Sequence, residues 1–72
     1  MIEPEEIAKW AELYDFGYRN LDLSSQEASA ARRELYRLFR ERYATLFPGR
    51  SVPFAQFNNE AIRKIKAYLR QS

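Results

Sequence analysis

The chain has 72 residues and a net charge of +2, and 46% of its residues are hydrophobic while 31% are charged. This composition is typical of a globular protein and not of a disordered one. Cysteine and histidine are both absent, which excludes disulfides and thiolate metal sites and removes the usual acid–base group near neutral pH. We expect one helical domain over residues 1–72, held together by packing and helix capping.

The first residues are acidic where a secretory signal would be basic, with Glu3, Glu5 and Glu6 close to Met1. No apolar run approaches the roughly 20 residues that a membrane-spanning helix needs. We therefore expect a cytoplasmic protein with no membrane partner.

A first helix is expected from Pro4 to Tyr14 or Phe16. Proline suits the first helical position, because its missing N–H would have no partner there in any case. Four residues with helical spacing should form the buried face of this helix: Ile7, Trp10, Ala11 and Tyr14. Gly17 is expected to end the helix, since glycine adopts a left-handed conformation at low cost.

The second helix has the clearest sequence signal. Ser24 and Glu27 have the spacing of a capping box, which predicts a helix that continues to about Leu46 and ends at Phe47-Pro48-Gly49. Its core residues should be Ala28, Ala31, Leu35, Leu38, Phe39 and Leu46.

Arg42 falls on the core stripe of this second helix by its spacing. We expect its aliphatic part to lie along the core and its guanidinium to reach water. The alternative is an ion pair with Glu12 or Asp15 of the first helix, which is less favourable because buried ion pairs are costly.

A third helix is expected from a cap at Asn58 or Asn59 to about Arg70. Its apolar face should be Ala61, Ile62, Ile65, Tyr68 and Leu69. Pro53 predicts a short extra turn before it. Together these elements predict an all-α fold, a small three-helix bundle built on the long second helix, whose ~22 residues would span roughly 33 Å.

Sequence motifs for catalysis are missing. Two glycines do not make a phosphate-binding loop, and no nucleophile has an obvious activating base. Glu12, Asp15 and Asp22 could meet near the first connection, but a solvated acidic surface explains them better than a cation site. We expect a protein that is not an enzyme and has no cofactor, metal or small-molecule substrate.

Charge is distributed very unevenly along the chain. Residues 1–30 contain seven acids and two bases, whereas residues 31–72 contain ten bases and three acids. Six of these bases fall on one stripe of the second helix and one stripe of the third: Arg33, Arg37 and Arg40, then Arg63, Lys66 and Arg70. Because guanidinium groups pair well with phosphate oxygens, these stripes predict a nucleic-acid-binding accessory protein.

The alternative function is a protein–protein adaptor or a self-associating module. Tyrosine, tryptophan and arginine are enriched at binding hot spots. The candidate contact residues are Trp10, Tyr18, Tyr36 and Tyr43. The aromatic residues could equally be part of the core edge, and acids of the first helix could pair with the basic stripes. The choice between a nucleic-acid-binding protein and a protein–protein module depends on whether the acidic first helix covers the basic stripes.

Overall fold

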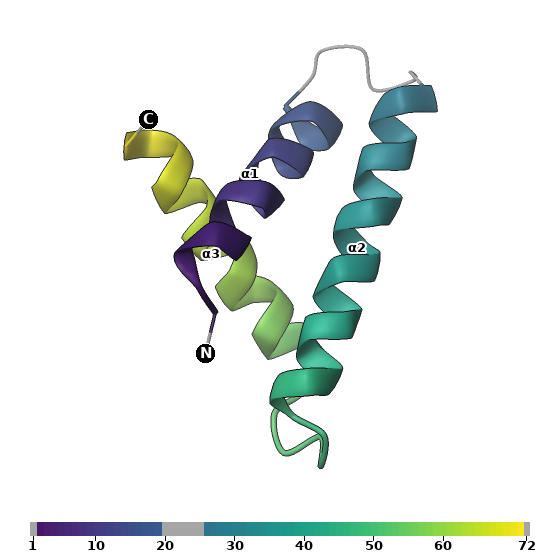
Figure 1. The fold of residues 1–72 in the computed structure, drawn as a ribbon, viewed down its shortest axis with the longest axis vertical. Helices are drawn as coiled ribbons and strands as arrows, with labels where there is room; N and C mark the ends of the chain where they lie inside the picture. The colour runs from purple at the N-terminus through teal and green to yellow at the C-terminus, as the bar shows by residue number, and fades with distance from the viewer. Residues whose placement is uncertain (1, 20–25, 72) are drawn as a thin grey trace.

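The computed structural model describes residues 2–19 and 26–71, which form three helices around a shared apolar core (Figure 1). The helices are α1 (Pro4–Tyr18), α2 (Gln26–Leu46) and α3 (Phe54–Gln71). The predicted all-α three-helix bundle is confirmed, and α2 is its longest helix with 21 residues. Figure 1 shows that α2 and α3 diverge from their connection like the arms of a V, with α1 lying between them. α1 therefore supplies most of the packing that holds α2 and α3 together.

The core contains one large aromatic residue from each helix. The Trp10 ring of α1 lies edge-on to the rings of Phe39 in α2 and Phe57 in α3, with centroid distances of 4.9 and 6.5 Å. Edge-to-face pairs of this kind stabilise a core beyond the effect of the area they bury. Trp10 is only 3% exposed, so this residue is not available for the partner contact considered above.

α1 begins at Pro4 as predicted, and the Glu3 N–H donates to the Glu6 carboxylate over 2.8 Å to close its first turn. The predicted stop at Gly17 is wrong, because the helix continues to Tyr18. Gly17 is instead buried against α2, where Arg32 Nη1 donates to its carbonyl over 2.7 Å. The glycine allows the two helices to approach closely and does not serve to end α1.

α2 ends at Leu46 as predicted, while Ser24 of the expected capping box lies outside the described residues. Four of the expected core residues are fully buried, namely Ala28, Ala31, Leu35 and Phe39. Leu38 and Leu46 are partly buried against the same core.

Arg42 makes the contact that we considered less favourable, but with a different carboxylate. Its Nε lies 2.8 Å from Glu6 Oε1, and both side chains are 27% exposed. The partner is Glu6, and not Glu12 or Asp15, because the first turn of α1 lies beside the last turns of α2. This half-buried pair links the start of α1 to the end of α2.

α3 begins at Phe54, so the predicted cap at Asn58 or Asn59 is wrong. The Pro53 carbonyl accepts the N–H groups of Gln56 and Phe57 over 3.0 and 3.2 Å. The short turn expected after Pro53 is therefore the first turn of α3. Phe57, Ala61 and Ile65 are buried. Tyr68, expected on the apolar face, is 40% exposed and lines an open hollow with Ile2, Pro4 and Ile7.

Candidate nucleic-acid interface

All six basic residues of the two predicted stripes are exposed. Three project from α2 and three from α3, which diverge along their length (Figure 1). The six residues differ in what surrounds their guanidinium or ammonium groups.

Arg37 and Arg63 are held by carboxylates of their own helices. Arg37 Nη2 lies 2.7 Å from Glu34 Oε2, and its Nη1 also contacts Glu41. Arg63 Nε donates to Glu60 over 3.0 Å. These hydrogen bonds hold the pKa values of Glu34 and Glu60 below the usual glutamate value and raise the pKa values of both arginines. Much of the charge at these two positions is thus compensated locally.

Arg40 is surrounded by aromatic rings. Its Cζ lies 4.7 Å from the ring centroid of Tyr36 and 5.0 Å from that of Phe54, and its Nη2 donates to the Tyr36 hydroxyl over 2.8 Å. Tyr36 itself is 46% exposed. These contacts with two rings and a hydroxyl restrict the guanidinium while it keeps its charge.

The residues after α2 place a further arginine near Arg40. Arg40 and Arg50 both line a hollow of about 290 Å³, which we call the Arg40–Arg50 hollow. Its other lining residues are Tyr43, Ala44, Phe47, Pro48 and Phe54. Within residues 2–19 and 26–71, the structure gives Arg33, Arg40 and Arg50 no carboxylate partner.

Two backbone features fix the position of Arg50. Arg50 has a φ of 56°, in the left-handed region, and its N–H donates to the Phe47 carbonyl over 2.9 Å. The Tyr43 hydroxyl donates to the Val52 carbonyl and ties the following residues to α2. Phe47-Pro48-Gly49 predicted a turn here, but no local pattern indicated that the turn brings Arg50 beside Arg40.

A second basic cluster lies at the other end of α3. Lys66 and Arg70 line a hollow of about 330 Å³ together with Arg19, Tyr14 and Leu69. Arg19 also pairs with Asp15 at 3.4 Å, and both of these side chains are more than half exposed. Lys66 and Arg70 are therefore brought together with a cation of α1, and they do not share a hollow with the basic residues of α2.

Tyr18 and Tyr43, two of the candidate partner residues, lie in different settings. Tyr18 is 51% exposed, its ring is stacked on Tyr14 at 5.2 Å, and the Arg32 Cζ lies 5.9 Å from its centroid. Tyr43 is partly buried against the core. Tyr18 is the more open of the two.

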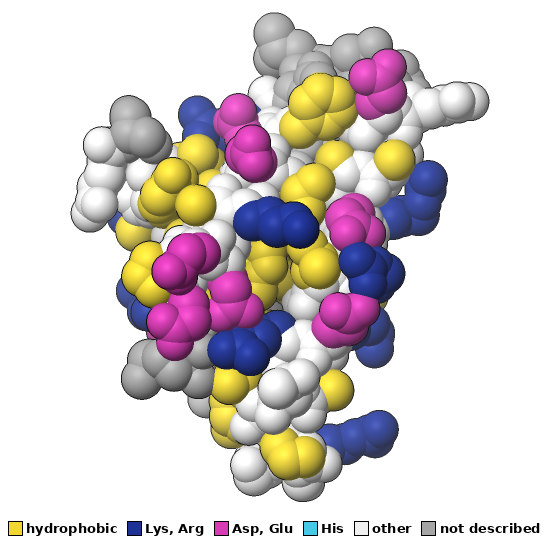
Figure 2. Space-filling view, viewed as in Figure 1, with side chains coloured by type: hydrophobic (Ala, Val, Ile, Leu, Met, Phe, Trp, Pro, Cys, Tyr) yellow, Lys and Arg dark blue, Asp and Glu magenta, His cyan; other side chains and the backbone are white. Residues whose placement is uncertain are grey.

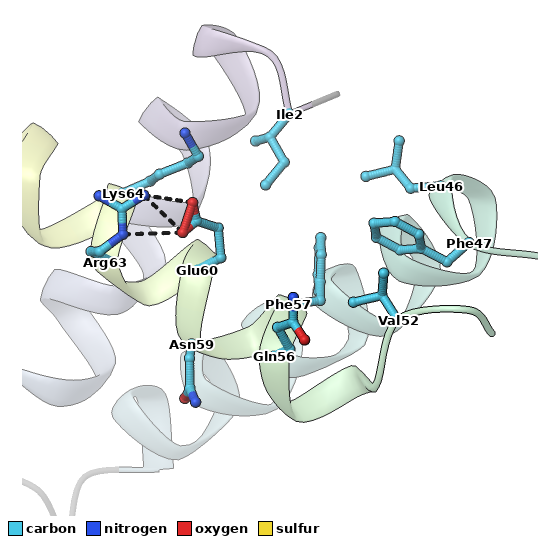
Figure 3. A pocket seen from close by; sticks show the side chains of 10 residues that line it. All are labelled: Ile2, Leu46, Phe47, Val52, Gln56, Phe57, Asn59, Glu60, Arg63 and Lys64. Atoms are coloured by element: carbon cyan, nitrogen blue, oxygen red, sulfur yellow. Dashed lines mark hydrogen bonds and ion pairs between the residues drawn. The ribbon is translucent and has the colours of Figure 1, made fainter.

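A hollow of about 810 Å³ lies between Ile2, which precedes α1, the end of α2 with its connection, and the first half of α3. We call it the apolar hollow. Figure 3 shows Leu46, Phe47 and Val52 at one end and the charged side chains of Glu60, Arg63 and Lys64 at the other. Ile2 and Phe57 contribute to its apolar surface, and Gln56 and Asn59 to its polar edge. No sequence pattern pointed to this hollow, because its lining comes from segments that are far apart in the sequence.

Figure 2 shows acidic side chains gathered over the N-terminal turn of α1. Along the outer margin of α2 it shows Lys and Arg side chains with acidic side chains between them. α1 lies against the inner side of α2 and leaves that margin open on this face.

None of the three described helices combines the length and the hydropathy that a membrane crossing requires. Across residues 2–19 and 26–71, no three acidic side chains come together as a potential metal site. Asp22, one of the three carboxylates considered above, lies outside the described residues. No family model matches the chain, and neither a curated protein nor a solved structure is significantly similar to it.

Proposed function

We propose that this chain is a non-enzymatic accessory protein that binds nucleic acid through α2 and the connection after it. The observation that carries the proposal is the setting of Arg40. Its guanidinium is held over Tyr36 and Phe54, shares a hollow with Arg50, and has no carboxylate partner among the described residues.

Such a guanidinium suits a phosphate for two reasons. Arginine presents a planar set of donors that matches phosphate oxygens. A side chain that is already ordered loses less conformational entropy when it binds. Arg33 lies two turns before Arg40 on the same stripe, so Arg33, Arg40 and Arg50 extend the contact from α2 into the connection.

The test is a fluorescence anisotropy titration with labelled DNA and RNA at about 50 and about 200 mM salt. We expect binding at the lower salt concentration and a clear loss of affinity at the higher one, because phosphate contacts release counterions. Replacing Arg40 and Arg50 together by alanine should weaken binding about tenfold or more at low salt.

The matched control is the double variant Arg37→Ala with Arg63→Ala. It removes the same two positive charges, but from arginines that carboxylates already compensate. We expect it to weaken binding about twofold. Absence of binding at low salt would refute the proposal, and an equal loss in both double variants would refute the assigned surface.

The apolar hollow favours a second candidate function, which is self-association of this chain through that hollow. Leu46, Phe47 and Val52 form an open apolar surface, and the opposite charges of the two halves of the chain favour contact between copies. Sedimentation equilibrium over a range of concentrations tests this candidate.

For this candidate, we expect the unmodified chain to associate and Val52→Glu to remain monomeric, since Val52 lines the hollow. Ala55→Glu is the matched control. Ala55 is exposed and does not line the hollow, so this substitution adds the same charge outside it. A chain that stays monomeric at ~1 mM would exclude this form of the function.

A further inference from the structure

We infer that the nucleic acid bound by this chain is single-stranded, and that one unpaired base sits in the Arg40–Arg50 hollow. This inference rests on the proposed function and specifies its substrate. It follows from the size of the hollow, the chemistry of its walls and the charge pattern of α2.

The size of the hollow suits a single flat ring system. Its volume of about 290 Å³ is slightly smaller than that of typical ligand pockets, which measure about 300–1,000 Å³. A base that is paired and stacked within a duplex cannot enter such a hollow. An unpaired base of a single strand can rotate out of the stack and enter it.

The walls of the hollow suit a base. Tyr43, Phe47 and Phe54 line it, and the Tyr43 ring lies 5.6 Å from that of Phe47 and 5.3 Å from that of Phe54. Bases stack on aromatic side chains and on guanidinium planes with little sequence preference. Arg40 and Arg50 line the same hollow, so their charges lie close to the phosphates that would flank a seated base.

Contacts within the chain hold the walls of the hollow in place. The Tyr43 hydroxyl donates to the Val52 carbonyl, the Arg50 N–H donates to the Phe47 carbonyl, and the Arg40 guanidinium lies over the rings of Tyr36 and Phe54. A preformed site binds with a smaller loss of conformational entropy.

The charge pattern of α2 disfavours a duplex lying along the helix. Two carboxylates lie along this stripe. Glu34 follows Arg33 directly, Glu41 follows Arg40 directly, and both pair with Arg37. A duplex backbone along this stripe would bring its phosphates near both carboxylates. A single strand that enters at the end of α2 needs only Arg40, Arg50 and the aromatic walls.

The test compares three labelled ligands of one length by anisotropy: a single strand, the same strand with abasic sites, and a duplex. We expect the single strand to bind at least fivefold more tightly than either of the others, because stacking of a base contributes measurably to affinity. The abasic strand keeps the phosphates and loses only the bases, so this comparison does not depend on any protein variant.

A protein variant tests the aromatic wall. Phe54→Leu keeps an apolar side chain but removes the ring, and we expect it to weaken single-strand binding about fivefold. Duplex binding should weaken less, because a duplex loses only the contact of the ring with Arg40. Phe16→Leu is the matched control, because Phe16 is an exposed phenylalanine of α1 and does not line the hollow. It should bind the single strand like the unmodified chain.

The possible failures are distinguishable. Equal binding of all three ligands, with a common loss in the Arg40 and Arg50 double variant, overturns the inference but leaves the proposed function intact. Tighter binding of the duplex also overturns the inference alone. Absence of binding to all three ligands at low salt overturns both.

Discussion

At the scale of single residues, Gly17 and Arg32 set the distance between α1 and α2. Gly17 is buried, and a Cβ added to it would lie 2.8 Å from Arg32 Cγ and 3.3 Å from the Ala28 carbonyl oxygen. Arg32 also donates to Ser29 Oγ over 3.1 Å and to the Gly17 carbonyl over 2.7 Å. A side chain at position 17 would therefore push against an arginine that is fixed at its far end.

We predict that Gly17→Ala lowers the free energy of unfolding by about 1–2 kcal/mol, because overpacking outweighs the better helix propensity of alanine. Urea denaturation followed by circular dichroism measures this change. Gly49→Ala is the matched control, since nothing lies within 4 Å of its added Cβ and its φ is not positive. It should leave stability unchanged to within about 0.5 kcal/mol, and an equal loss in both variants would contradict the close-approach explanation.

At the scale of whole helices, α2 and α3 each carry ion pairs between residues three or four positions apart. Arg37 pairs with Glu34 and Glu41 on α2, and Arg63 pairs with Glu60 on α3. Pairs at this spacing support a helix from its exposed side, and their effect is modest because water and salt screen them. The carboxylates also compensate the positive charges of Arg37 and Arg63, which would otherwise attract a phosphate.

These pairs predict a pH dependence of stability. The folded pKa values of Glu34 and Glu60 are lowered, chiefly by hydrogen bonds from Arg37 and Arg63, relative to a usual value of 4.5. Because the folded pKa is the lower one, the stabilisation is fully present above the unfolded pKa. It is lost as the pH falls through the lowered values.

We therefore expect the urea midpoint to fall between about pH 5 and pH 3, and to fall less in the double variant Glu34→Gln with Glu60→Gln. The variant should be the less stable protein at neutral pH and should approach the unmodified chain in acid. At about 1 M salt the difference at neutral pH should shrink, because both pairs are exposed. Parallel pH profiles would contradict this account.

At the scale of the whole molecule, the position of α1 determines which surfaces are open. α1 fills the space between α2 and α3 and contributes Trp10 to the aromatic core. Its acidic N-terminal turn contacts the end of α2 through the Glu6–Arg42 pair. The outer margin of α2, where Lys and Arg side chains alternate with acidic ones, lies on the side away from α1 (Figure 2). This arrangement leaves the basic margin of α2 free for the proposed contact.

The same arrangement divides the basic residues into separate sites. Because α2 and α3 diverge, Lys66 and Arg70 lie with Arg19 around one hollow, while Arg40 lies with Arg50 around another. A strand bound at the end of α2 would therefore be contacted mainly by α2 and its connection. The three cations around Tyr14 form a distinct basic surface at the far end of α3.

Local sequence patterns were enough to predict the helical class, the start of α1, the end of α2 and most of the buried positions, because proline placement and apolar spacing act locally. The start of α3 was misplaced, because Asn58 and Asn59 resemble N-cap residues. The Pro53 carbonyl already accepts the hydrogen bonds of the first turn. The prediction that Gly17 ends the first helix was wrong, because the role of this glycine depends on its contact with α2.

The partner of Arg42, the contact of Trp10 with Phe39 and Phe57, and the position of Arg40 and Arg50 around one hollow all depend on how the helices pack. Helical spacing fixes the direction of a side chain on its own helix, but the tilt between helices fixes which side chains from different elements meet. The uneven charge was therefore visible in the sequence, whereas the division of that charge into compensated pairs and open sites required the fold.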